Sequence, residues 1–167
     1  SMAPEVMDSA QLAWLQSHLW ILSGLYGCVR PFHAVEPYRL EMGAKLAVDD
    51  ACDLYAFWDD KLARIIAPAG SNTTIVNLAS VEYAKAVLPH LAADATVVTC
   101  LFGEGVRNGK PIQRSTASKK ARGSMVRWMA ENKLEDASGL TAFDVGYRHA
   151  PELSNKNTLV FLNEQTL

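Results

Sequence analysis

The residues best suited to chemistry lie in one basic stretch, residues 115–127, which reads Ser-Thr-Ala-Ser-Lys-Lys-Ala-Arg-Gly-Ser-Met-Val-Arg. We expect a helix over residues 118–132, which places Lys119, Lys120 and Arg122 in its first turns. The helix dipole makes that end positive, so cations there are normally disfavoured. The free backbone N–H groups of a first turn also attract anions. The pattern predicts an anion site. A solvated amphipathic helix whose basic side chains bind nothing explains the pattern about equally well.

Charge is segregated along the chain. Between Gly105 and Ala130 there are seven basic residues and no acidic ones, so this basic segment is formally +7. The whole chain is −2, which leaves −9 for all other residues. Such segregation favours a local anion site over a general polycation surface. The basic residues of the segment are Arg107, Lys110, Arg114, Lys119, Lys120, Arg122 and Arg127.

The predicted helix has an apolar and a basic side at about 100° per residue. Gly123 falls on the basic side, where it costs about 1 kcal/mol relative to alanine. It also leaves bare backbone that a large anion could approach. Arg122 sits at the border, where its stem can pack and its guanidinium can reach outward. The side expected to face the core holds Ala121, Met125, Trp128 and Met129.

Two strand ends carry further candidate polar residues. Glu104 follows a predicted buried strand, and strand ends often carry functional side chains. It is one of two candidates for a catalytic acid or base, beside Glu41. Asn77 and Ser80 bracket a predicted strand-to-helix junction, where Ser80 is expected to be an N-cap and Asn77 a turn former.

A short extended stretch contains Tyr38, Arg39 and Glu41. Alternation along an extended chain would place Arg39 and Glu41 on one face, where they could form a buried ion pair. Such a pair would have either a structural role or a role in the site.

The predicted elements interleave. We expect helices over residues 8–26, 49–66, 80–88 and 118–132, and extended segments over 36–42, 73–78, 96–102, 146–148 and 158–162. Arg107-Asn-Gly-Lys110 carries the Asn-Gly signal of a tight hairpin, with residues 111–114 as the returning arm. The predicted fold class is therefore mixed α/β (α+β).

Length and composition bound the kind of protein. We expect a single domain over residues 1–167, because 167 residues suffice for one real core. Ser1 before Met2 is typical of a residue left by tag cleavage, and residues 1–7 are expected to be an unstructured start. No apolar run approaches the roughly 20 residues of a membrane helix. The N-terminus also lacks a signal peptide, so we expect a cytoplasmic protein without a membrane partner.

Cysteine and histidine usage gives no metal signal. Cys28, Cys52 and Cys100 are widely spaced without a C-x-x-C motif, which suits a reducing cytoplasm and buried thiols. The four histidines have no metal-ligand spacing. We therefore predict no metal and no cofactor.

Several segments, in order along the chain, resemble one bacterial family, the YaaA peroxide-stress proteins. They begin with Leu-Ser-Gly-Leu-Tyr-Gly at 22–27, Arg-Pro at 30–31 and Pro-Tyr-Arg-Leu-Glu-Met-Gly at 37–43. Leu54-Tyr, Phe57-Trp, Asn77-Leu-Ala-Ser and Glu82-Tyr with Lys85 continue the pattern. Phe102 with Glu104, and Ser115 followed by Lys-Lys-Ala-Arg-Gly at 119–123, complete it. The resemblance covers nearly the whole chain from about Asp8.

The resemblance implies a cytoplasmic protein that helps cells survive hydrogen peroxide and affects intracellular iron. It implies a mixed sheet flanked by helices, with a basic cleft to which DNA binding has been attributed. On matching positions, the implied cleft cations are Arg30, Arg39, Lys119, Lys120 and Arg122, with Gly123 in the same motif. The implied polar residues of the site are Tyr38, Glu41, Asn77, Ser80 and Glu104.

The chain also departs from the family pattern. It matches only the later two-thirds of family members, and their opening strand and following helical region have no counterpart here. We expect a shortened chain, a naturally short homologue or one half of a split protein. Without the opening strand, a sheet edge or a face of the core would be exposed, and self-association or a separate chain could cover it.

Three functions remain open at this point. The first is a nucleic-acid-binding stress protein. The basic segment supports it, and the net charge of −2 argues against it. The second is an enzyme or small-molecule binder that holds a phosphate or carboxylate with the same cations and uses a Glu as acid or base. The third is a degenerate, mainly structural homologue.

Overall fold

The computed structural model describes residues 2–166, so the expected tag remnant Ser1 lies outside the described residues. The described chain forms two compact units. Unit 1 comprises residues 2–15, 76–78 and 97–166, and unit 2 comprises residues 16–75 and 79–96. Each unit has its own apolar core, while the assignment of the whole chain to a single domain stays a prediction.

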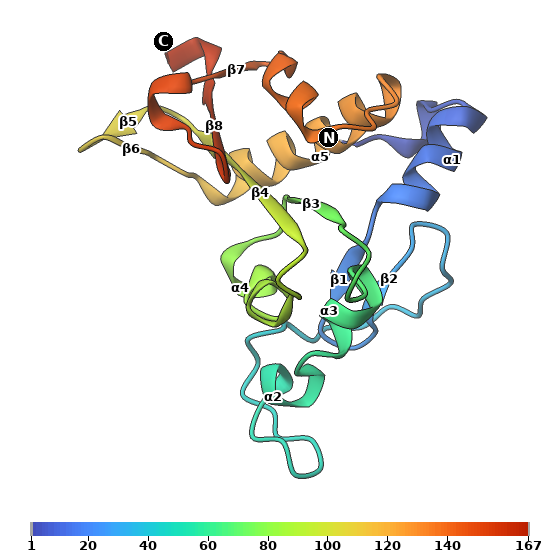
Figure 1. The fold of residues 1–167 in the computed structure, drawn as a ribbon. Helices are drawn as coiled ribbons and strands as arrows, with labels where there is room; N and C mark the ends of the chain where they lie inside the picture. The colour runs from blue at the N-terminus through green and yellow to red at the C-terminus, as the bar shows by residue number, and fades with distance from the viewer. Residues whose placement is uncertain (1, 167) are drawn as a thin grey trace. The chain divides into compact units, whose positions relative to one another are not determined.

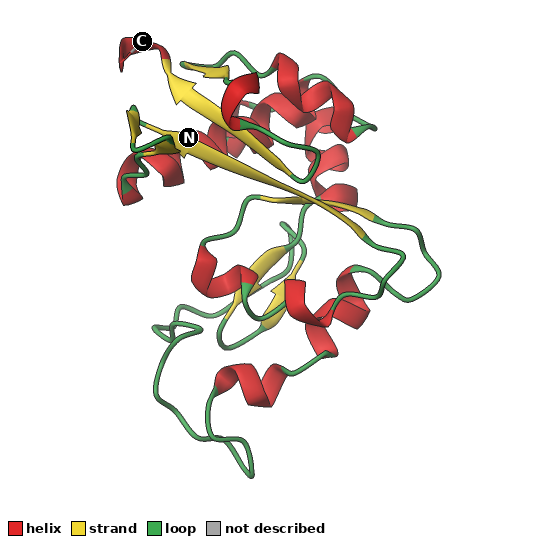
Figure 2. Cartoon of the chain, turned by 60° about the vertical axis from the view of Figure 1, so that its left-hand side comes forward, coloured by secondary structure: helices red, strands yellow, loops and turns green. Residues whose placement is uncertain are grey.

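A four-stranded mixed sheet organises unit 1, with strand order β3-β4-β8-β7. β4 (Thr96–Gly103) and β8 (Thr158–Asn163) are parallel, and β7 (Tyr147–His149) runs antiparallel to β8. β3 (Thr74–Asn77) lies at the edge beside β4. Figure 2 shows the long strands in yellow with helices beside them. The mixed α/β fold class is confirmed.

The connection from β4 to β8 contains the basic helix. Parallel neighbours need a long crossover, and here it holds α5 (Ser115–Glu131) followed by the 3₁₀ turn η3 (Ala137–Ala142). Before α5, the chain forms a two-stranded hairpin that projects from the end of β4 (Figure 1), with β5 at Val106–Arg107 and β6 at Lys110–Pro111. Asn108 and Gly109 both have positive φ, as a tight hairpin turn requires.

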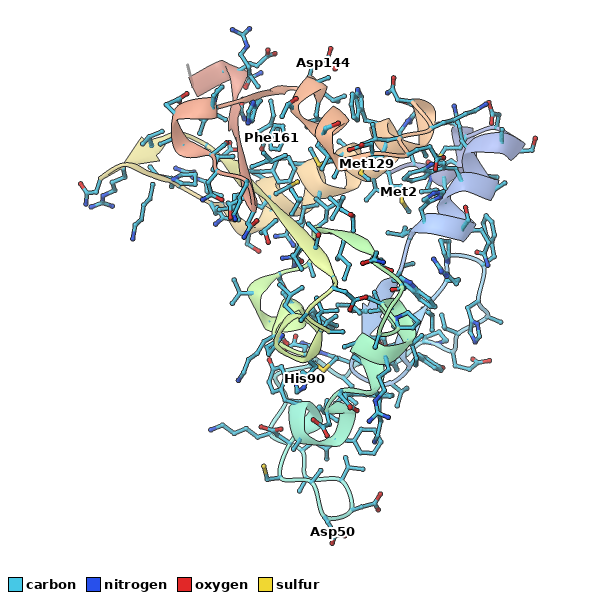
Figure 3. All side chains as sticks on the ribbon, viewed as in Figure 1. Met2, Asp50, His90, Met129, Asp144 and Phe161 are labelled. Atoms are coloured by element: carbon cyan, nitrogen blue, oxygen red, sulfur yellow. The ribbon has the colours of Figure 1, made fainter. Side chains whose placement is uncertain are left out.

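Aromatic rings dominate the core of unit 1. Phe102 is 1% exposed, and its ring stacks on Phe161 with centroids 5.5 Å apart. Tyr147 and Phe143 meet Phe102 edge-on at 5.4 and 6.1 Å. Phe161 is labelled in Figure 3, where its side chain lies among those of unit 1. Met125 of α5 is fully buried against the same cluster, which confirms the expected apolar side of the helix.

The remaining short elements of unit 1 lie near the two ends of the chain. η1 (Pro4–Val6) precedes α1 (Ser9–His18), which begins in unit 1. Met7 is buried, so residues 2–7 are not the unstructured start that we expected. The turns η4 (Pro151–Leu153) and η5 (Glu164–Thr166) flank β8.

Unit 2 is built from short elements around a second core. Its hairpin pairs β1 (Ile21–Ser23) with β2 (Gly27–Val29), and α2 (Leu54–Trp58) and α3 (Lys61–Ile66) follow a long irregular segment. α4 (Val81–Ala84) and η2 (Leu88–His90) complete it. The buried residues of this core are Met42, Leu54, Leu62, Ala63, Ala86 and Val87.

Several predicted elements are confirmed and others are wrong. The strands near 73–78, 96–102, 146–148 and 158–162 are present, although β3 is half-buried rather than buried. The expected helix over 8–26 ends at His18, because residues 21–29 form a hairpin. The segment over 36–42 contains no strand, and the helix over 80–88 shrinks to Val81–Ala84.

The expected helix over 49–66 is divided into α2 and α3. Asp59 lies between them with φ 44° and ψ −127°, a backbone conformation that an α-helix cannot contain. The predicted helix therefore stops after Trp58 and restarts at Lys61.

Candidate anion-binding site

Helix α5 begins three residues earlier than the sequence predicts. Its free backbone N–H groups belong to residues 115–117, because Ser118 N–H already donates to the carbonyl of Arg114 at 2.8 Å. Lys119 and Lys120 therefore stand in the second turn, away from the free N–H groups, and both are exposed. The expected coincidence of first-turn N–H groups with these cations is therefore wrong.

Ser118 fixes the start of α5 on the sheet. The residue is 3% exposed, and its hydroxyl donates to the carbonyl oxygen of Phe102 at 3.3 Å. Phe102 is two residues from Glu104, so the first turn of α5 is held beside the end of β4.

Arg122 is half-buried in unit 1. Its Nη1 donates to the carbonyl oxygen of Leu78 at 3.5 Å, and burial lowers the pKa of its guanidinium. Among the described residues, no carboxylate pairs with it. Gly123, next along α5, is also half-buried inside the helix.

Most of the basic segment lacks ion-pair partners. Arg127 pairs with Glu131 at 2.6 Å along one turn of α5. Within residues 2–166, none of the other six cations of the segment forms an ion pair with a carboxylate. We call these six the basic surface, and they are Arg107, Lys110, Arg114, Lys119, Lys120 and Arg122.

Glu104 lies just after β4 and is held by two neutral donors. Tyr147 Oη donates to its Oε1 at 2.6 Å, and Asn163 Nδ2 donates to its Oε2 at 3.1 Å. Burial, and then the hydrogen bond to Glu104, raises the pKa of Tyr147 to about 12, so this phenol is a neutral donor at physiological pH. The carboxylate thus sits at the carboxyl ends of the parallel strands β4 and β8, where open α/β sheets commonly bind ligands.

Asn77 is the remaining predicted site residue of unit 1. Its Nδ2 donates to Thr99 Oγ1 at 3.2 Å, which links the edge strand β3 to β4. This contact gives Asn77 a role in the sheet rather than the turn-forming role that we expected.

Arg30 serves the fold of unit 2. Its guanidinium lies 3.6 Å from the ring centroid of Trp20, and its Nη1 donates to the carbonyls of Ser17 and Leu19 at 3.0 and 3.2 Å. Ser17 belongs to the last turn of α1, whose carbonyls need such donors. Arg30 therefore has a structural use that the sequence pattern does not reveal.

Tyr38 belongs to a hydroxyl network of unit 2. Ser23 is buried, and its Oγ accepts N–H groups from Leu25 and Tyr26 at 3.2 and 2.8 Å. It also hydrogen-bonds to the hydroxyl of Tyr38, whose ring meets Tyr26 edge-on at 5.5 Å. The Leu-Ser-Gly-Leu-Tyr-Gly motif is thus a turn that packs on the segment that contains Tyr38.

The expected ion pair between Arg39 and Glu41 is absent from the described residues, and both side chains are exposed. Ser80 occupies the N-cap position of α4 but makes no capping hydrogen bond with its side chain. Glu82, in the first turn of α4, accepts the N–H of Gly43 with its Oε1 at 2.8 Å. Arg39, Glu41 and Ser80 lie in unit 2, whereas the basic surface and Glu104 lie in unit 1.

Sequence reasoning missed Tyr147, Asn163 and Ser118. The signal for Asn163 was available, because it ends a strand at the same edge as Glu104. No local pattern marks Tyr147, which is 43 residues from Glu104. Within residues 2–166, no three His, Cys, Asp or Glu side chains are grouped to hold a metal ion, and no described helix is long and apolar enough to cross a membrane.

The fold and the site define a class: a mixed α/β protein with a long basic helix in the crossover between two parallel strands. A family model described as "Peroxide stress protein YaaA" matches residues 1–153. The chain belongs to this family.

Curated relatives agree with this assignment. A protein named UPF0246 from Pediococcus pentosaceus is 45% identical over 98% of this chain and 64% of its own length. Another from Laribacter hongkongensis is 48% identical over 95% of this chain and 62% of its own length. The chain therefore spans less than two-thirds of the length of these relatives.

Proposed function

We propose that this protein binds DNA, or another phosphate-bearing anion, through the basic surface of unit 1. Lys119, Lys120 and Arg122 would supply contacts from α5, and Arg107, Lys110 and Arg114 would supply contacts from the hairpin and its returning arm. Cationic side chains that contact phosphates give binding that depends on salt and only weakly on sequence.

One observation carries the proposal: six of the seven cations in the basic segment have no carboxylate partner among the described residues. The remainder of the chain is formally −9, so acidic side chains were abundant enough to pair with them. Unpaired like charges repel one another, which costs stability unless a counter-charge is bound. A polyanion supplies that counter-charge.

The family assignment supplies the setting for the proposal. The family description names peroxide stress, and we propose that anion binding serves survival of peroxide in the cytoplasm. Free thiols fit a reducing compartment, and Cys28, Cys52 and Cys100 are all free. Arg39 and Glu41 are exposed in unit 2, and a functional role for them stays a prediction.

Charge-removal variants test the proposal. Fluorescence anisotropy with a labelled DNA duplex should show weaker binding for Lys119→Ala and Lys120→Ala, and near loss for Arg122→Ala. Lys156→Ala is the matched control, because it removes one exposed cation of unit 1 outside the basic segment. If Arg122→Ala binds like the wild type, Arg122 is not part of the site. If all four variants bind alike, the basic surface is the wrong surface.

A second candidate is a small-molecule binder or enzyme that acts on a phosphate or carboxylate, with Glu104 as the acid or base. The half-buried position of Arg122 favours it, because a partly desolvated guanidinium holds a single anion more strongly than an exposed one does. Calorimetric titration with inorganic phosphate distinguishes the two. Saturable binding that Arg122→Ala abolishes, together with no affinity for duplex DNA, would favour the small ligand.

A further inference from the structure

The carboxylate of Glu104 is held by an unusual set of partners. Both of its donors are neutral, and both come from one cross-strand pair, since Tyr147 of β7 lies opposite Asn163 of β8. Within residues 2–166, no lysine, arginine or histidine forms an ion pair with it. A half-buried negative charge is therefore kept beside the most basic segment of the chain without any cation in contact.

Both oxygens of this carboxylate accept hydrogen bonds from the fold. A glutamine could not take the same two bonds, because its carbonyl oxygen would face one donor and its amide nitrogen, itself a donor, would face the other. A carboxylate that lacks a cationic partner is more costly to bury than an amide. The negative charge of Glu104 has no counter-charge in contact with it among the described residues.

The remaining hydrogen-bonding capacity defines the ligand. An ionised carboxylate offers about two lone-pair sites on each oxygen. Oε1 has accepted one bond from Tyr147 and Oε2 one from Asn163, so one site remains on each oxygen. Two acceptors side by side fit a ligand with two adjacent N–H donors, in the bidentate arrangement that carboxylates favour.

Guanine is the natural base with that arrangement. Its Watson–Crick edge carries a ring N–H next to an exocyclic amine. The amines of adenine and cytosine stand beside an acceptor ring nitrogen, and the ring N–H of thymine or uracil stands between two carbonyls. Only the guanine edge gives a carboxylate two donors without opposing it with an acceptor.

We propose that Glu104, positioned by Tyr147 and Asn163, binds the Watson–Crick edge of an unpaired guanine. The inference rests on the proposed function, because the basic surface would hold the phosphates of the same ligand. The bond from Ser118 to the carbonyl of Phe102 keeps the basic helix beside the strand end that carries Glu104. In a duplex this edge is paired with cytosine, so the guanine belongs to a free nucleotide or to an unpaired position in a nucleic acid.

Inosine is the matched probe, because it lacks the exocyclic amine of guanine and keeps the ring N–H. Calorimetry on the wild-type protein should find guanosine monophosphate bound about tenfold or more tightly than inosine monophosphate, since a bidentate base contact discriminates to that degree. Glu104→Gln should remove the difference, because the amide presents one acceptor and one donor. Lys156→Ala should retain it.

Single-stranded oligonucleotides with one guanine or one inosine in a thymine background separate the two sources of the base. Equal affinities for both oligonucleotides and for both nucleotides would overturn the inference, while steep salt dependence alone would leave the proposed function standing. If the protein prefers guanine to inosine in the nucleotides but not in the oligonucleotides, the site binds a free nucleotide. The wild-type comparison holds even if Glu104→Gln fails to fold.

Discussion

At the level of single residues, Gly27 shows why the 22–27 motif ends in glycine. Its φ is +74°, and an added Cβ would lie 2.8 Å from side-chain atoms of Leu62 and Trp58. Gly70, also in unit 2, has φ +81° with nothing within 4 Å of an added Cβ. Both alanine variants should incur about 1 kcal/mol of backbone strain, and Gly27→Ala should lose a further 1–3 kcal/mol through overpacking. Urea unfolding measures both, and equal losses would contradict this account of Gly27.

The three thiols should differ in reactivity. Cys52 is exposed and Cys28 is half-buried, with burial raising the pKa of Cys28. Burial raises the pKa of Cys100 to about 12. Because the thiolate is the reactive form, a thiol reagent at pH 8 should label Cys52 first and Cys100 only on unfolding. Mass spectrometry of the labelled peptides checks this order, and early labelling of Cys100 would contradict its burial.

The same burial makes stability depend on alkaline pH. The Cys100 thiol has a reference pKa of 9.0 and a folded-state pKa of about 12. The folded state therefore keeps a proton that the unfolded state loses, so stability is full below pH 9 and declines as pH rises toward 12. Urea unfolding should give a smaller free energy at pH 11 than at pH 8, and the decline should be shallower for Cys100→Ala. An identical decline in both proteins would exclude Cys100 as a cause.

The sequence identified individual residues of the candidate site but not their contacts. Glu104 was singled out because it follows a strand, but its donors come from 43 and 59 residues away. Arg30 was assigned to the anion cleft through the family resemblance, and a sequence shows its charge but not its contacts. Its stacking on Trp20 and its bonds to the end of α1 depend on the hairpin that returns the chain there.

At the level of elements, the break between α2 and α3 should be a strained point. Asp59 has φ 44° and ψ −127°, a region that glycine adopts far more readily than aspartate. We expect Asp59→Gly to stabilise unit 2 by about 1 kcal/mol. Its neighbour Asp60 has φ −85° and pairs with Arg64, so Asp60→Gly should destabilise it. Thermal unfolding of the two variants should shift in opposite directions, and a shift in the same direction would refute the strain.

Element prediction succeeded where pattern and tertiary context agree. The apolar arc of α5 and the β-branched runs of β3, β4 and β8 specify their own structure. The hairpin β1–β2 was read as helix because Leu19 and Leu22 continue a helical spacing. The Ser23 hydroxyl accepts a hydrogen bond within its own turn, and residues 21–23 pair with residues 27–29 as antiparallel strands. Such tertiary and turn effects override a weak periodic pattern.

At the level of the whole molecule, charge rather than fold carries the functional argument. The net charge of −2 hides a +7 segment, and that segment forms a hairpin and a helix of the same unit. Family membership is established over residues 1–153, while the chain spans less than two-thirds of its curated relatives.

The salt dependence of DNA binding tests the central claim most directly. Affinity for a labelled duplex, measured by anisotropy between 50 and 200 mM salt, should fall steeply, with a log–log slope near −0.9 for each phosphate contacted. Each of Lys119→Ala and Lys120→Ala should make that slope shallower by about 1, and Lys156→Ala should leave it unchanged. A slope that is flat in the wild type, or equally steep in all variants, would contradict anion binding by the basic surface.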